Sequence, residues 1–104
     1  MLDARKVALQ LVRELRTLRP VIARHDRDLA DQLQRALNSV ALNLGEGESS
    51  QKGNKQKHYC LAHGSANEVR AALDLSSAWG WAEPSAEALA TLDRLMRMLY
   101  GLTH

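Results

Sequence analysis

The stretch that decides the fold reads QRALNSVALNLGEG over residues 34–47, and a second stretch reads LAHGSANE over residues 61–68. Both place polar residues inside segments whose apolar residues otherwise recur at helical spacing. Polar groups on a buried helix face cost free energy unless they form hydrogen bonds. The two stretches therefore predict paired helices whose polar side chains bond to one another.

Four segments of the chain repeat apolar residues at alternating intervals of three and four. Such seams are typical of helices that pack about 20° apart. The 18 leucines and 15 alanines also favour helix, whereas valine, isoleucine and threonine together number only nine. The sequence predicts an all-α protein, an antiparallel up-down-up-down four-helix bundle. The seams are Ala4, Ala8, Leu11, Leu15, Leu18 and Ile22; Ala30, Leu33, Leu37, Val40 and Leu44; Tyr59, Ala62, Ala66, Val69 and Leu73; and Ala88, Leu92, Leu95, Leu99 and Leu102.

Residues 1–104 are expected to form one domain with four helices, at about 4–24, 27–48, 54–79 and 84–102. Asp26 and Asn54 are the expected N-caps of the second and third helices. Gly80 is expected to end the third helix in the left-handed conformation, and Pro84 to lie in the first turn of the fourth.

Pro20 interrupts the first of these helices. It either kinks the helix or ends it near Arg19, because proline lacks the N–H that the helix needs. The apolar Val21 and Ile22 continue the stripe, which favours a kink.

The turn between the second and third helices centres near Ser50 or Gln51. Antiparallel partners across it should have residue numbers that sum to about 102. Arg35 then lies opposite Glu68, and we expect an ion pair between them. The expected structural polar network comprises Arg35, Ser39, Asn43, Glu46, Ser65 and Glu68.

No catalytic constellation accompanies this network. Glu46 and Glu68 lie on different levels of the hairpin and make a poor acid–base pair. The four histidines have no metal-ligand spacing, and Cys60 is expected to be a buried, inert thiol. We therefore expect no enzymatic activity, no cofactor and no metal.

Positive charge is concentrated in the N-terminal half of the chain. Residues 4–27 hold seven basic and two acidic residues, whereas residues 58–104 hold three basic and five acidic. On a continuous helix the seven basic residues fall within about 140° of arc. The candidate nucleic-acid-binding residues are Arg5, Lys6, Arg13, Arg16 and Arg24, with Lys52, Lys55 and Lys57 as a second cluster.

Three interpretations of this basic face remain open. It is a solvated helix surface, a phosphate-binding face, or a contact for an acidic partner. Arginine favours phosphate because its guanidinium binds two oxygens at once. Surface aromatic residues that would stack on single-stranded bases are scarce, so binding should be phosphate-led and weak in sequence preference.

Trp79 and Trp81 flank the expected end of the third helix. They are expected to pack in the core or at a subunit interface, with a hot spot for a partner protein as the alternative. No apolar run is long enough for a membrane span. A single cysteine suits a reduced, cytoplasmic setting.

Residues 34–47 resemble the "RA-x-x-S-I-x-x-N-I-A-E-G" helix of a known family, and residues 61–68 resemble its "A-x-G-S-x-x-E" segment. The sequence AWGW at residues 78–81 stands where that family has "A-x-x-x-G-Y". The family is the four-helix-bundle proteins encoded by intervening sequences in large-subunit ribosomal RNA genes, and the accessory variability proteins of diversity-generating retroelements are similar. The resemblance spans about Leu9 to Leu102. Gly45 replaces the usual alanine, and Asn67 replaces a larger apolar residue.

The resemblance implies a barrel-like homopentamer without enzymatic activity. In the retroelement relatives it implies a basic surface that binds nucleic acid and a reverse transcriptase. We therefore expect a non-enzymatic oligomeric scaffold that binds structured RNA or DNA through its basic face. The alternative is a protein–protein interaction adaptor with no nucleic-acid role.

Overall fold

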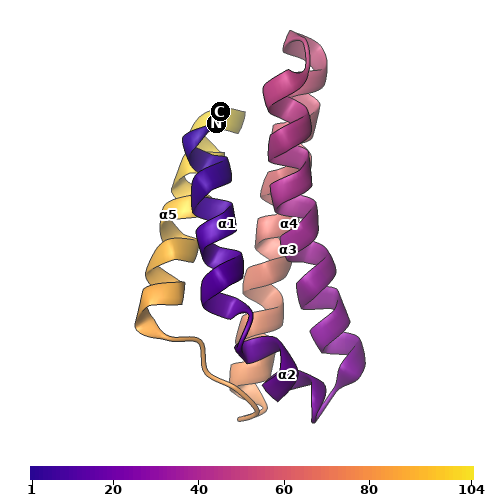
Figure 1. The fold of residues 1–104 in the computed structure, drawn as a ribbon, viewed down its shortest axis with the longest axis vertical. Coiled ribbons are helices and arrows are strands. Elements are labelled where there is room, and N and C mark those ends of the chain that lie inside the picture. Colours follow the sequence, from indigo (N-terminus) through magenta and orange to yellow (C-terminus); the bar gives the residue numbers. More distant parts are fainter.

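Five helices and no strand make up the protein in the computed structural model, which describes residues 1–104 (Figure 1). They are α1 (Asp3–Leu15), α2 (Leu18–Ala23), α3 (Arg27–Ser49), α4 (Lys52–Ala78) and α5 (Ala86–Thr103). The prediction of an all-α protein is confirmed. The first expected helix is divided between α1 and α2.

Pro20 accounts for the division of the first helix. Its missing N–H would have bonded to the carbonyl of Arg16, and its ring would clash with that carbonyl in a regular helix. The break lies at Arg16 and Thr17, which keep helical dihedral angles (φ −60°, ψ −29° and φ −81°, ψ −19°). The chain is therefore kinked rather than ended, and Ile22 in α2 remains fully buried.

Two expected helix boundaries differ from the structure. The side chain of Asp26 caps α3 as predicted, by accepting a hydrogen bond of 3.0 Å from the backbone N–H of Leu29. Asn54 does not cap α4, which already begins at Lys52 after Gln51. Pro84 lies ahead of α5 rather than in its first turn, because Ser85 is the N-cap and accepts from the N–H of Ala88 at 3.0 Å. The serine hydroxyl accepts from a free N–H of the first turn of α5, whereas a proline side chain has no hydrogen-bond acceptor.

Gly80 ends α4 as the sequence predicts. Its φ of +76° lies in the left-handed region, which glycine adopts without strain. The N–H of Gly80 donates to the carbonyl of Ser77, and the N–H of Trp81 donates to the carbonyl of Ser76, both at 2.9 Å. These two bonds form a Schellman motif.

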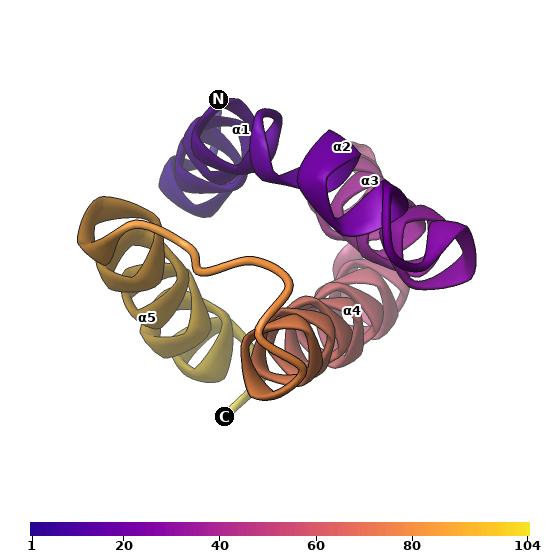
Figure 2. The ribbon, with the colours of Figure 1, turned by 90° about the horizontal axis from the view of Figure 1, so that it is seen from below.

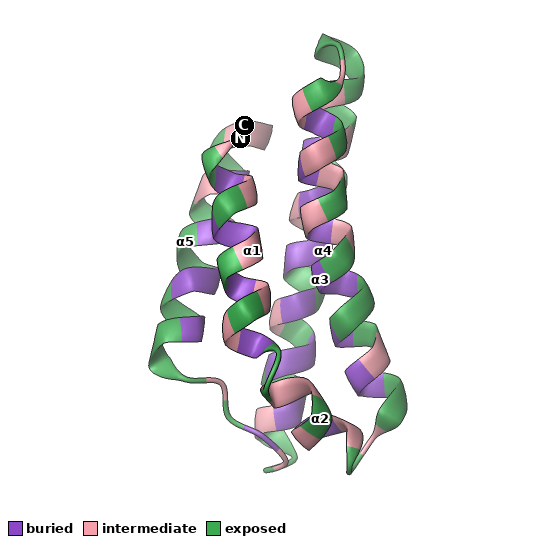
Figure 3. Ribbon diagram, viewed as in Figure 1, coloured by how far each residue is buried: buried purple, intermediate pink, exposed green.

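The helices surround one apolar core. α3 and α4 form a long hairpin, α1 contacts both α3 and α5, and α5 contacts α4, while α2 packs on α3. Figure 2, which views the molecule from below, shows the helices arranged around a common centre. In Figure 3 the buried residues line the inner sides of the helices, and the tip of the α3–α4 hairpin is mostly exposed. The largest fully buried residues include Leu11, Leu15, Leu33, Leu44, Leu73, Leu92, Leu95 and Leu99.

No helix is both long enough and apolar enough to cross a membrane.

Candidate nucleic-acid interface

Three of the predicted binding residues, at α1 and α2, are exposed arginines without an acidic partner. Arg13, Arg16 and Arg24 are exposed, and none of them takes part in an ion pair. Arg16 lies at the kink and Arg24 at the C-terminal end of α2. Their guanidinium groups are therefore available to an anionic ligand.

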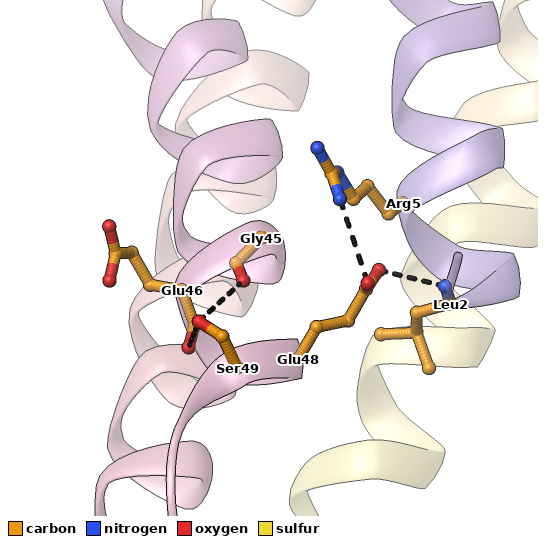
Figure 4. A network of polar contacts seen from close by, with 6 residues as sticks. All are labelled: Leu2, Arg5, Gly45, Glu46, Glu48 and Ser49. Carbon is orange, nitrogen blue, oxygen red and sulfur yellow. Dashed lines mark hydrogen bonds and ion pairs between the residues drawn. The ribbon is translucent and has the colours of Figure 1, made fainter.

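Arg5 and Lys6 have acidic neighbours. Nη1 of Arg5 lies 3.5 Å from Oε2 of Glu48, and Nζ of Lys6 lies 4.0 Å from Oδ1 of Asp3. Oε1 of Glu48 also accepts a hydrogen bond of 2.7 Å from the backbone N–H of Leu2 (Figure 4). Glu48 thus joins the start of α1 to the end of α3 and partly neutralises Arg5. Sequence reasoning missed Glu48, because its partners are far away along the chain.

The Arg5 side chain lies beside Gly45, where an alanine methyl would also fit in ordinary van der Waals contact. A Cβ at position 45 would lie 3.7 Å from Cζ and Nε of Arg5. Glu46, one residue further along α3, points away from this contact (Figure 4).

A groove of about 210 Å³ lies between the kinked α1–α2 segment and α3. Val12 and Leu37 supply its apolar surface. Arg16 and Arg19 bring guanidinium groups, and Gln34 and Asn38 bring side-chain amides. The volume is several times the roughly 30 Å³ share of one water molecule, so a phosphate group has room here. Gln34 and Asn38 were not among the predicted binding residues; both are exposed polar residues at i and i+4 of α3.

Arg19 is the cation of this groove that forms an ion pair. Its Nη2 donates to Oδ1 of Asp31 at 2.6 Å, while its Nε is buried without a hydrogen-bond partner. A buried N–H without an acceptor is unfavourable.

The lysine cluster lies at the other end of the molecule. Lys52, Lys55 and Lys57 occupy the start of α4, at the tip of the α3–α4 hairpin, whereas α2 lies at the opposite end of the long axis (Figure 1). Lys52 and Lys57 are exposed and Lys55 is half-buried. The structure therefore does not gather all eight predicted basic residues into one patch. Of the eight, only Arg16 lines the groove.

Part of the predicted polar network meets across α3 and α4. The hydroxyls of Ser39 and Ser65 share a hydrogen bond of 2.7 Å. Nδ2 of Asn43 donates to the carbonyl and the hydroxyl of Ser39, at 2.9 and 3.1 Å. Oδ1 of Asn43 accepts from Nδ1 of His58 at 2.9 Å. His58 was not predicted as a member of the network.

The expected Arg35–Glu68 ion pair does not form. Both residues are exposed and line a groove of about 490 Å³ on the outer side of the hairpin, with Leu75 beside them. The Ser39–Ser65 hydrogen bond confirms the hairpin register, but the Arg35 and Glu68 side chains line the groove without forming an ion pair. Glu46 also stays exposed and joins no ion pair.

Cys60 is exposed, so the expectation of a buried thiol is wrong. It lies one residue beyond Tyr59, which takes the buried position of the α4 seam. Trp79 is also exposed, and hence it is not a core residue of this chain.

Comparison with known proteins identifies the family. The family model of the 23S rRNA-intervening sequence protein matches residues 1–101. Searches of curated proteins and of solved structures find no match. Because the family model covers nearly the whole chain, the protein belongs to the 23S rRNA-intervening sequence protein family.

Proposed function

We propose that the protein is a non-enzymatic, oligomeric, antiparallel up-down-up-down four-helix bundle that binds structured RNA or DNA by its phosphates. In this arrangement α1 and α2 together count as the first helix. The observation that carries the proposal is the groove between α1–α2 and α3, which Arg16, Arg19 and two side-chain amides line together. The guanidinium and amide groups of this groove are hydrogen-bond donors, and such donors bind the phosphate oxygens of a nucleic-acid backbone.

Binding of this kind depends on charge rather than on sequence. Each phosphate that is neutralised releases counterions, so affinity falls as salt rises, with a slope of about −0.7 to −0.9 per contact. We therefore propose recognition of helical shape and backbone, with little sequence preference.

Self-association is the second part of the proposal. Leu42, Leu61 and Leu75 are exposed by 69%, 48% and 48%, all on α3 and α4. The outer groove beside Leu75 holds the unpaired Arg35 and Glu68, one charge of each sign. A second copy could cover such a surface and pair both charges. That the assembly is a homopentamer rests on the family resemblance.

A protein–protein adaptor is the alternative, favoured by the same exposed leucines. In that case the outer groove takes a different protein, such as a reverse transcriptase, as the resemblance to retroelement proteins suggests. The cytoplasm is the proposed location, since the chain has a single, unpaired cysteine.

Fluorescence anisotropy of a labelled RNA hairpin and a labelled DNA duplex tests the nucleic-acid proposal. Titrations from low to physiological salt should give micromolar or tighter binding that weakens steadily as salt rises. If the folded protein binds neither probe at low salt, the adaptor becomes the working account.

A further inference from the structure

Three aromatic rings form one parallel stack at the α2 end of the molecule. Trp81 is the middle ring. Its centroid lies 5.4 Å from that of His25 and 5.4 Å from that of Trp79, with interplanar angles of 1° and 8°. Figure 2 views this end of the molecule, with α2, the end of α4 and the connection to α5. Segments distant in the sequence thus contribute to one stack.

The local backbone fixes the middle of this stack. Trp81 follows Gly80, and its N–H is bonded to the carbonyl of Ser76 in the Schellman motif. The Ser76 hydroxyl donates to the carbonyl of Leu73 at 3.0 Å and also approaches that of Ala82 at 3.4 Å. The turn that places both tryptophans is therefore held from both sides. Little conformational freedom is left to lose when a ligand binds.

The outer ring remains open to solvent. Trp79 is 64% exposed, although one of its faces meets Trp81. A tryptophan whose only role is packing would bury its indole and find a partner for its N–H. The stack therefore presents a free, flat π-surface.

Unpaired positive charge flanks the stack. Arg24 and Arg27 lie on either side of His25 in the chain, and neither forms an ion pair. Of the carboxylates close by in the sequence, Asp26 accepts from the N–H of Leu29 and Glu83 accepts from the hydroxyl of Ser77, while Asp28, next to Arg27, is exposed. A ligand that joins a flat ring to an anionic group fits this combination.

We propose that Trp79 is a stacking platform for an unpaired nucleobase, whose phosphates reach Arg24 and Arg27. The proposal rests on the proposed function and narrows its substrate to a duplex with a short single-stranded tail. Arg24 lies five residues beyond Arg19 of the groove, and the stack leads from His25 through Trp81 to Trp79 in two centroid separations of 5.4 Å. In this proposal a strand seated in the groove continues past Arg24, and its unpaired tail carries a base onto Trp79.

Intrinsic fluorescence tests the stack directly, because Trp79 and Trp81 are the only tryptophans. In a Trp81→Phe protein, Trp79 is the sole reporter. This protein is titrated at low salt with a blunt RNA hairpin and with the same hairpin carrying a three-adenosine 3′ tail, and then with the DNA equivalents. The tailed probes should quench Trp79 and bind about 5- to 150-fold more tightly than the blunt ones, the range expected of base stacking on an aromatic side chain.

Variants of the protein separate stacking from phosphate binding. Trp79→Ala should bring the tailed and blunt affinities to within twofold while leaving the blunt affinity unchanged. Trp79→Phe should retain most of the preference, because phenylalanine keeps a stacking face. Leu89→Ala is the control, since Leu89 is an exposed apolar residue on α5. A tail that neither quenches Trp79 nor raises affinity overturns the platform while leaving phosphate binding intact.

Failure of the proposed function has a different signature. If neither hairpin binds, the platform is assessed with a ten-nucleotide oligoadenylate, and absence of Trp79 quenching overturns it. A Trp79→Ala protein that loses its oligomeric state in sedimentation, with no response of Trp79 to any nucleic acid, would show that a second copy covers the ring. That result also overturns the platform.

Discussion

The ring of Tyr59 lies directly against the backbone of Gly47, so that a Cβ at position 47 would come within 2.8 Å of Cδ1 of the ring. Both residues are buried where α3 and α4 approach each other near the tip of their hairpin. No side chain larger than hydrogen fits at position 47 without displacing a buried aromatic ring.

Gly47→Ala should therefore destabilise the protein, although alanine is the better helix former. Overpacking of this kind costs about 1–3 kcal/mol. The matched control is Gly64→Ala, also within a helix, where a Cβ would meet no heavy atom within 4 Å. That change should raise the free energy of unfolding by about 0.5–1 kcal/mol. Urea unfolding measures both, and a Gly47→Ala protein as stable as the wild type would contradict the packing.

Glu48→Ala should weaken the attachment of α1 to α3. The change removes the acceptor of the Leu2 N–H and the partner of Arg5. Because these groups are partly exposed, we expect a loss of about 1 kcal/mol. Glu46→Ala is the control, since its side chain points away, and its effect should stay within about 0.5 kcal/mol. Equal effects of the two changes in urea unfolding would show that the Glu48 contacts contribute nothing specific.

Stability should fall in alkaline solution through Tyr59. Burial raises the pKa of its hydroxyl above the ordinary value, and the negative charge of Glu48 raises it further. The folded protein then holds this proton more tightly than the unfolded chain does. The resulting stabilisation is complete below a pH of about 10, and it is lost as the pH rises through the folded-state pKa. Unfolding free energies measured from pH 8 to 11 should decline less steeply for Tyr59→Phe, and identical slopes would refute this role.

The exposed leucines of α4 should control self-association. Leu61→Glu/Leu75→Glu places charges on the surface that we propose a second copy covers. Sedimentation should show an assembly for the wild type and an 11.6 kDa monomer for this variant. Leu89→Glu, on α5, should leave the assembly intact. A monomeric wild type would remove the oligomer from the proposal.

Much of the fold could be predicted from the sequence, because the apolar seams report which side of each helix is buried. Leu33, Val40 and Leu44 lie in the core as their spacing indicates. The length of the α3–α4 connection also set the register that brings Ser39 to Ser65. These are local properties of the chain.

The orientation of polar side chains around the hairpin could not be predicted in the same way. Arg35 and Glu68 share a level of the hairpin, but the rotation of each helix depends on how all the helices pack together. Glu48 bonds to the start of α1, and Trp81 stacks on His25. The spacing of residues along the chain predicts neither contact. The candidate groove was therefore only half predicted: its arginines were recognised as part of a basic stripe, and its amides were not.

The measurement that tests the central claim most directly compares two charge-matched variants in RNA-hairpin anisotropy. Arg13→Glu/Arg16→Glu alters the proposed face, while Arg94→Glu/Arg97→Glu makes the same charge change with the same spacing on exposed positions of α5. We predict that the first variant loses at least about tenfold in affinity, or 1.4 kcal/mol, and that the second loses much less. Equal losses in the two variants would mean that net charge alone attracts the RNA, and they would contradict a binding face on α1 and α2.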